Sequence, residues 1–248
     1  MDRTIRDLKI GTRLKFGAYG CRGNAPVPIV WLKASPDCDF IAECALDSIQ
    51  FDNQELEQGN RDRRWNGNNE YGVSNIYQFL NSDEQVWYQQ THQYDRPPNY
   101  QQYPGFLTGF ADFEKASLMD GVNLPAFGDI IGGNTFALFR KKGVRPHPSA
   151  DMQMRFWNEY MLTSYIPFWT RDPMGGSETR VMIIGRDGYG ASKEASGRAG
   201  LRPVCNINGR AVVEIDDDGI YKLKAFEVAD VVEEIYTDDA LFNFLGLR

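Results

Sequence analysis

Two short motifs, FWTRDP at residues 168–173 and GLRPV at residues 200–204, place the tightest constraint on the fold of this chain. The segment between them, RVMIIGRDGYG at residues 180–190, begins as a strand-like run of apolar residues. Its glycine-rich end is not the G-x-G-x-x-G phosphate loop, and no helical pattern follows it. The pattern therefore predicts a tight hairpin turn with Arg186, Asp187 and Tyr189 exposed at its tip.

The rest of the chain is expected to form short strands and short helices separated by loops. Ser74 is a candidate helix N-cap, and Ile76, Phe79 and Leu80 follow it at helical spacing. This pattern predicts a short helix that ends near Asn81. The other expected elements are strands at 8–20, 28–35 and 39–51 (the last running into a helical turn), a loop at 53–70, a helix at 112–119, two strands and a turn at 123–139, a helix at 155–165, and a hairpin around an Asp-Gly turn at 211–225.

A third motif, YGVSNIYQFLN at residues 71–81, completes a recognisable set. With the two later motifs it resembles a bacterial and phage family of domains of unknown function, which carries Y-x-x-S-x-x-x-x-[WF]-L-N, W-L-R-S-P and G-V-R-P. The resemblance implies a C-type lectin-like fold, with a twisted antiparallel sheet, two short helices and long loops. The order of the expected elements predicts an α+β class independently. We expect a C-type lectin-like domain at 1–213, followed by a C-terminal hairpin and an acidic amphipathic extension at 214–248.

The motif residues Trp169, Arg171, Arg202 and Pro203 have two interpretations. In the first, the two arginines face a ligand. In the second, which we favour, Trp169 fills the core and Arg202 ties a loop to a neighbouring strand through hydrogen bonds to backbone or carboxylate groups. Asp172 stands where the family has serine, and it could pair with either arginine.

Charge and composition exclude several classes of function. The net charge of −7 and the isoelectric point near 5.0 argue against nucleic-acid binding, which needs clustered basic residues. We expect no membrane span, because there is no run of eighteen apolar residues, and no Sec signal is visible. The four cysteines have irregular spacing and the chain has two histidines, so we expect reduced thiols and no zinc site.

Other candidate sites are weak. The acidic segment around Asp216 and Asp218 lacks the glutamate that completes a calcium loop, so we expect no metal and no cofactor. His92 and His147 have no nucleophile motif beside them, and we assign no catalytic residue.

The segment 85–103 is dense in glutamine and tyrosine and is interrupted by two prolines, and its part from Trp87 to Tyr103 is the most suggestive for binding. Tyrosine offers a large rigid contact area, and glutamine offers adaptable hydrogen bonds. A recognition arm and a flexible polar loop both remain open for it. In the first case, one loop face carries the ligand-binding residues Tyr94, Tyr100, Tyr103, Arg186, Asp187 and Tyr189.

Two functions follow as expectations. The resemblance implies a non-enzymatic binding or structural module, associated with a phage virion or left in the cytoplasm. Its partners would be a host-surface glycan or protein, other virion proteins, or a second copy of this chain. The alternative is an enzyme on a formylglycine-generating type of fold, although the paired redox cysteines expected near its C-terminal end are absent. The apolar stripe after residue 226 predicts an accessory helix or a partner contact.

Overall fold

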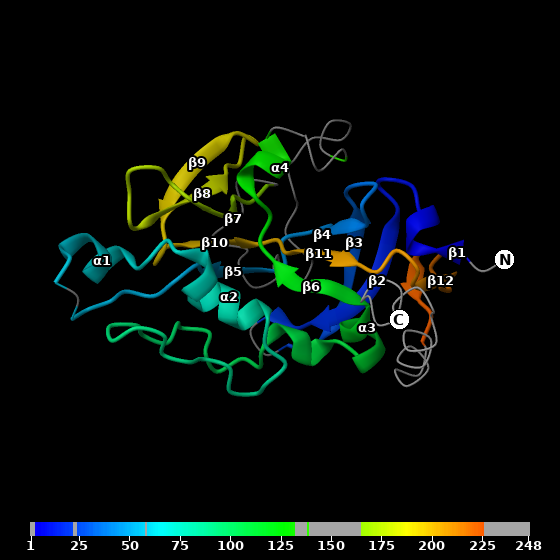
Figure 1. The fold of residues 1–248 in the computed structure, drawn as a ribbon, viewed down its shortest axis with the longest axis horizontal. Helices are drawn as coiled ribbons and strands as arrows, with labels where there is room; N and C mark the ends of the chain where they lie inside the picture. Colours follow the sequence, from blue (N-terminus) through cyan, green and yellow to red (C-terminus); the bar gives the residue numbers. More distant parts are fainter. Residues whose placement is uncertain (1–2, 22–23, 58, 132–137, 139–164, 226–248) are drawn as a thin grey trace, which may run out of the picture.

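The computed structural model describes residues 3–21, 24–57, 59–131, 138 and 165–225, and these form an α+β fold (Figure 1). The strands are β1 (Arg3–Thr4), β2 (Arg13–Tyr19), β3 (Val27–Lys33), β4 (Asp39–Ala42), β5 (Asp47–Gln50), β6 (Leu118–Asn123), β7 (Phe168–Pro173), β8 (Arg180–Ile184), β9 (Gly190–Glu194), β10 (Arg198–Leu201), β11 (Val204–Ile207), β12 (Val212–Ile215) and β13 (Tyr221–Leu223). The helices are α1 (Arg61–Asn66), α2 (Asn75–Leu80), α3 (Asp112–Ser117) and α4 (Phe127–Ile131), with 3-10 turns at η1 (Ile5–Asp7), η3 (Tyr71–Val73) and η4 (Phe106–Gly109). The expected α+β class is confirmed.

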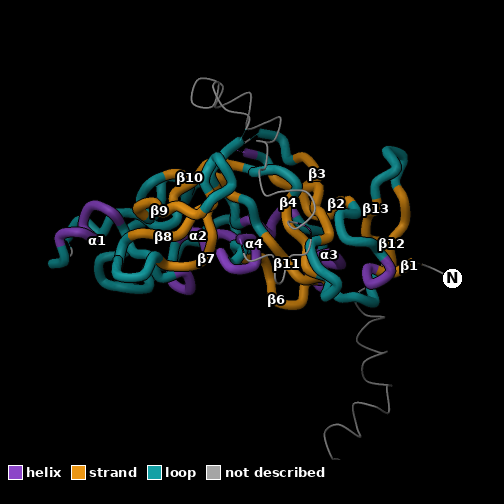
Figure 2. The backbone as a smooth tube through the Cα atoms, turned by 90° about the horizontal axis from the view of Figure 1, so that it is seen from above, coloured by secondary structure: helices purple, strands orange, loops and turns teal. Residues whose placement is uncertain are grey.

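The strands form two sheets, where the sequence led us to expect one. The eight-stranded sheet has the order β1-β12-β13-β2-β3-β4-β11-β6, and the five-stranded sheet has the order β5-β10-β7-β8-β9. Most neighbours are antiparallel, but β13 pairs with β2 and β10 pairs with β7 in the parallel sense. Figure 2 shows the two sheets following each other along the molecule, with β8 and β9 toward one end and β12 and β13 toward the other.

Two chain segments pass from one sheet into the other side by side. The expected single strand at 39–51 is broken into β4 and β5, which belong to different sheets, and β10 and β11 make the same passage. Backbone hydrogen bonds join the two crossings: Ala42 N donates to Pro203 O (2.9 Å) and Leu46 N to Leu201 O (2.8 Å). The two crossings are therefore hydrogen-bonded to each other, and together they form the joint between the sheets.

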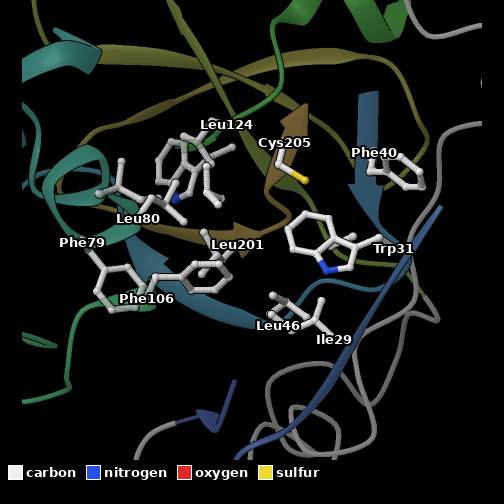
Figure 3. Packing of buried hydrophobic residues seen from close by; sticks show 14 of the residues in the cluster. Ile29, Trp31, Phe40, Leu46, Phe79, Leu80, Phe106, Leu124, Leu201 and Cys205 are labelled. Atoms are coloured by element: carbon white, nitrogen blue, oxygen red, sulfur yellow. The ribbon is translucent and has the colours of Figure 1, made fainter. Parts of the chain in front are cut away.

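One large apolar cluster fills the space on both sides of this joint. Trp31 and Trp169 are fully buried, and each satisfies its indole N–H on a backbone carbonyl, Phe16 O (3.0 Å) and Ile49 O (2.9 Å). Figure 3 shows Phe79 and Phe106 on one side of Leu201 and Trp31 on the other. The predicted burial of Trp169 is confirmed.

Several local predictions are confirmed by their hydrogen bonds. The Ser74 hydroxyl accepts from Tyr77 N (3.3 Å) and caps α2, which ends before Asn81 as expected. Helix α3 lies within the predicted segment 112–119. The hairpins β8–β9 and β12–β13 both form, and the glycines in their turns, Gly188 and Gly219, have positive φ.

Other local predictions are wrong. Helix α1 lies in the segment expected to be a loop, because the Asn60 side chain accepts from Asp62 N and Arg63 N and caps it. Helix α4 lies where strands were expected. The expected domain boundary after residue 213 falls inside β12, so the C-terminal hairpin is part of the eight-stranded sheet.

Some expectations concern residues outside those described: the helix at 155–165 apart from Tyr165, His147, and the extension after residue 225. Within the described part of the chain, no helix is both long and apolar enough to cross a bilayer.

Trp169→Ala should lower the free energy of unfolding by about 3–5 kcal/mol, because it removes a fully buried aromatic side chain and leaves a cavity. Urea denaturation monitored by circular dichroism measures the change. Trp65→Ala is the matched control, since Trp65 is 55% exposed and its loss should leave stability almost unchanged. Equal stability of the Trp169 variant and the parent would contradict the core assignment.

Candidate functional site

Arg202 lies at the joint between the sheets, between β10 and β11, and is 4% exposed. Its Nε donates to Ala42 O (3.0 Å), and its guanidinium carbon lies 5.2 Å from the centre of the Phe168 ring. Burial lowers the pKa of Arg202 to about 10, while the neighbouring Cys44 and Glu43 act in the opposite direction. The side chain is therefore still charged at neutral pH. Its hydrogen bond to Ala42 O lies at the joint and confirms the predicted bond of Arg202 to the backbone.

The rest of the G-L-R-P motif also builds the joint. A Cβ on Gly200 would lie 3.1 Å from Pro167 O and 3.3 Å from the Cβ atoms of Ala45 and Phe168, so only glycine fits without a shift. Pro203 is buried, and its carbonyl accepts from Ala42 N.

The W-x-R-x-P motif divides between the core and the surface. Arg171 has an exposed side chain, and its backbone N donates to Pro125 O (3.0 Å). Asp172 Oδ2 accepts from Phe127 N (2.5 Å), so this carboxylate caps α4, a role that the expected pairing with an arginine did not anticipate.

The motif at 71–81 connects α2 to β6. The Tyr71 hydroxyl accepts from Leu124 N (2.9 Å), and Asn81 Oδ1 accepts from Val122 N (3.2 Å). Phe79 and Leu80 are fully buried. The three motifs that carry the family resemblance thus have structural roles at most of their positions.

The glutamine- and tyrosine-rich arm, defined here as residues 85–103, is packed against the body of the protein. Tyr100, expected to be an exposed platform, is 2% exposed; its hydroxyl donates to Gln50 O (3.1 Å) and its ring stacks on Trp87 with centroids 5.6 Å apart. This part of the prediction is wrong, because Tyr100 and Trp87 pack on Phe79 of α2 and complete the core. Tyr94 and Tyr103 are partly exposed.

The turn between β8 and β9 has the expected form. Arg186 and Asp187 are exposed and Tyr189 is 72% exposed. Asp187 Oδ1 accepts from Tyr189 N (3.0 Å), and Gly185 N donates to Tyr189 O (2.7 Å). These bonds hold the backbone of the tip in one conformation.

The arm and the turn do not share one face. The arm bonds to Gln50 of β5, at one edge of the five-stranded sheet, whereas β8 and β9 lie at the opposite edge with β10 and β7 between them. Figure 1 shows the arm below α2 and the β8–β9 hairpin on the far side of β5 and β10. The expected single contact surface is therefore wrong.

A buried carboxyl group under the arm was missed in the sequence. Asp52 is 8% exposed; its Oδ1 accepts from Asn75 N and its Oδ2 from Asn68 N, both at 3.1 Å. Burial raises the pKa of Asp52 to about 7 against the lowering effect of these two bonds, and the carboxylates of Asp95 and Glu55 raise it further. Asp52 lies between the expected strand at 39–51 and the expected loop at 53–70, and nothing in its sequence context marks it as buried.

Two further side chains near Asp52, those of Glu55 and Tyr88, have buried polar atoms. Glu55 is 1% exposed and pairs with Arg63 (Oε1 to Nη2, 2.5 Å). The Tyr88 hydroxyl is buried with no hydrogen-bond partner among the described residues, and burial raises the pKa of Tyr88 to about 12. A carboxyl with a pKa near neutrality is a candidate proton donor or acceptor, but both oxygens of Asp52 are already engaged by the backbone.

In the described part of the chain, no three His, Cys, Asp or Glu side chains are arranged to hold a metal ion. Lys15 forms ion pairs at the acidic tip of the β12–β13 hairpin, where its Nζ contacts Asp216 Oδ2 (2.6 Å) and Asp218 Oδ2. His92 is half exposed at the outer surface of the arm, with Nδ1 3.6 Å from Asp95 Oδ2.

Comparison with known protein families, with characterised proteins and with solved structures finds no match to this chain. The family resemblance carried by the three motifs therefore stays a prediction.

Tyr100→Ala should destabilise the protein by about 3–5 kcal/mol, because the structure makes Tyr100 a core residue. Tyr94→Ala should change stability by less than about 0.5 kcal/mol, as for most surface positions. Thermal and urea unfolding of both variants distinguish a packed arm from a free one; two equally stable variants would mean that the arm does not pack in solution.

Asp52 should make the protein less stable as pH rises from about 4 to 7. Its pKa is raised from 3.8 in the unfolded chain to about 7 in the fold, so folding favours the protonated form. The stabilisation is complete below the unfolded pKa and is lost as pH passes through the folded pKa, by up to about 4 kcal/mol. Urea unfolding between about pH 4 and 8 should show this slope in the parent and not in Asp52→Asn.

Proposed function

We propose that this chain is a non-enzymatic binding module whose main contact is the β8–β9 tip, formed by Arg186, Asp187 and Tyr189. The observation that carries the proposal is the 72% exposure of Tyr189 on a turn that is fixed by its own hydrogen bonds. A large apolar ring held rigidly in solvent loses little conformational entropy on binding. Tyrosine and arginine are also enriched among the residues that dominate binding energy.

The partner is a host-surface glycan or protein, and the module is part of a phage virion. An aromatic ring can stack on the apolar face of a sugar, while Arg186 and Asp187 supply directional hydrogen bonds to its hydroxyl groups. The virion assignment and the C-type lectin-like form of the α+β fold rest on the three motifs. Short helices and long loops around the sheets agree with that form.

The outer surface of the arm offers a second, separate contact. Gln89, Gln90, Gln93, Gln101 and Gln102 are exposed there, and Tyr94 and Tyr103 are partly exposed beside them. Because the arm lies at the opposite edge of the five-stranded sheet from the tip, two partners can bind at once. Other virion proteins or a second copy of this chain are the partners that we assign to this surface.

The enzyme alternative is favoured by one observation, the pKa of Asp52 near 7. Against it stand the burial of Asp52 and the two backbone N–H groups that engage its oxygens. A general acid or base must reach the proton that it transfers. We therefore prefer the binding module.

Binding of the labelled protein to a panel of bacterial cells and purified cell-wall glycans tests the proposal. Tyr189→Ala should weaken binding at least tenfold without changing stability, because the ring is exposed in the free protein. Tyr94→Ala is the matched control, an equally sized truncation on the opposite edge that should bind host material like the parent. Equal binding by the Tyr189 variant and the parent would remove the tip from the site. A parent that binds nothing would leave a structural component of the particle as the better function.

A further inference from the structure

The arm is fastened to the segment that follows β5 at two points. On one side, the Tyr100 hydroxyl donates to Gln50 O (3.1 Å) and Asn99 N approaches Gln50 Oε1 (3.5 Å). On the other side, Asn53 Nδ2 donates to Pro97 O (2.7 Å). Asp52 lies between these two anchor residues in the chain and is 8% exposed, and Tyr88, Asp95 and Tyr100 of the arm are close enough to interact electrostatically with it.

The groups that face Asp52 carry an excess of negative charge. From the arm, Asp95 presents a carboxylate, and Tyr88 and Tyr100 present neutral hydroxyl-bearing rings that interact electrostatically with Asp52. From its own segment, Glu55 adds a carboxylate that Arg63 of α1 neutralises. The remaining charges of this region point to its rim, where Arg96 pairs with Glu57 (2.8 Å) and His92 is half exposed.

We propose that Asp52 is a pH-sensitive latch for the arm: the protonated carboxyl lets residues 85–103 close over it, and the ionised carboxylate favours their release from the 50–53 segment. An ionised Asp52 under the closed arm loses hydration and is repelled by Asp95. Opening of the arm relieves both costs, because water reaches Asp52 and Asp95 moves away.

The direction in which pH shifts the opening of the arm follows from the difference in the pKa of Asp52 between the closed and open forms. The pKa of Asp52 is about 7 with the arm closed and tends toward the ordinary 3.8 when water reaches the carboxyl. The closed arm is therefore most stable at low pH and opens more often as pH rises toward 7, above which the effect levels off. The difference of about three units sets an upper limit of roughly a thousandfold on the change in the opening equilibrium. This latch does not depend on what the module binds.

Hydrogen exchange of the wild-type protein, corrected for the intrinsic pH dependence of exchange, measures arm opening directly. Protection of the arm amides should fall at least tenfold between about pH 5 and 7.5, while the amides of β7 and β8 keep their protection. Constant protection of the arm over this range overturns the proposal. A carbon-13 NMR titration of the Asp52 carboxyl should have the same midpoint as the loss of protection, and a midpoint below about pH 5 also overturns it.

Three variants separate Asp52 from other groups. Asp52→Asn cannot ionise, so the protection of its arm should not change between about pH 5 and 7.5, whatever its level, and a pH response like that of the parent would refute the latch. Two variants are controls: His92→Asn, which removes the imidazole of the arm, and Asp217→Asn, which removes an exposed carboxylate in the distant β12–β13 turn. Both should retain the parent's response. Loss of the response in either of these would assign it to another group. If Asp52→Asn does not fold, the wild-type exchange and the NMR midpoint decide the question by themselves.

Discussion

The paired crossing of two chain segments, with Arg202 between them, is the constraint on which the rest of this structure depends. β4 continues into β5 and β10 into β11, and each pair moves from one sheet to the other at the same level. A backbone that leaves a sheet exposes carbonyl groups that need partners. The Arg202 side chain satisfies Ala42 O, and backbone bonds from Ala42 and Leu46 satisfy Pro203 O and Leu201 O. Each crossing therefore supplies hydrogen-bond partners that the other needs.

Side chains also bind backbone groups at several places where a long connection packs against the core. Asp172 accepts from Phe127 N, Asn81 from Val122 N, and Asp52 from Asn68 N and Asn75 N. Each of these side chains holds backbone from a remote part of the chain, which satisfies buried donors without regular secondary structure. Many polar residues are thereby committed to the fold, whereas the groups of the β8–β9 tip remain exposed.

Sequence patterns predicted the elements whose causes are local. The Ser74 cap, the Asp-Gly turn at residue 219 and the glycine-rich turn before Gly190 each depend on a few adjacent residues, and each forms as expected. The burial of Trp169 and the backbone bond of Arg202 also followed from residue type. Helix α1 was missed although its cap, Asn60, is local. Two other failures have distant causes. Helix α4 depends on a carboxylate 45 residues away, and the break between β4 and β5 depends on pairing with β10 and β11.

The candidate site shows the same division. The exposed tip could be predicted from its turn residues. Tyr100 was wrongly predicted to be exposed, because its glutamine-rich sequence neighbours give no sign that its ring packs on Phe79 of α2. Asp52 could not be found, because its pKa depends on burial under an arm that is distant in sequence. A sequence reports polarity, but it does not report which polar residues a folded chain covers.

The pairing of the two ends of the described chain has a consequence for biosynthesis. Among the described residues, β1 pairs with β12 alone, and β2 has β13 as its second neighbour. The pairing of these N-terminal strands is therefore complete only after residues 212–223 have been synthesised. While the ribosome is still producing the chain, the backbone donors and acceptors along β2 stay open to other nascent chains. We expect this protein to complete its larger sheet only after nearly all of the described residues have emerged. Chaperones that shield strand edges during synthesis should therefore raise its yield in cells.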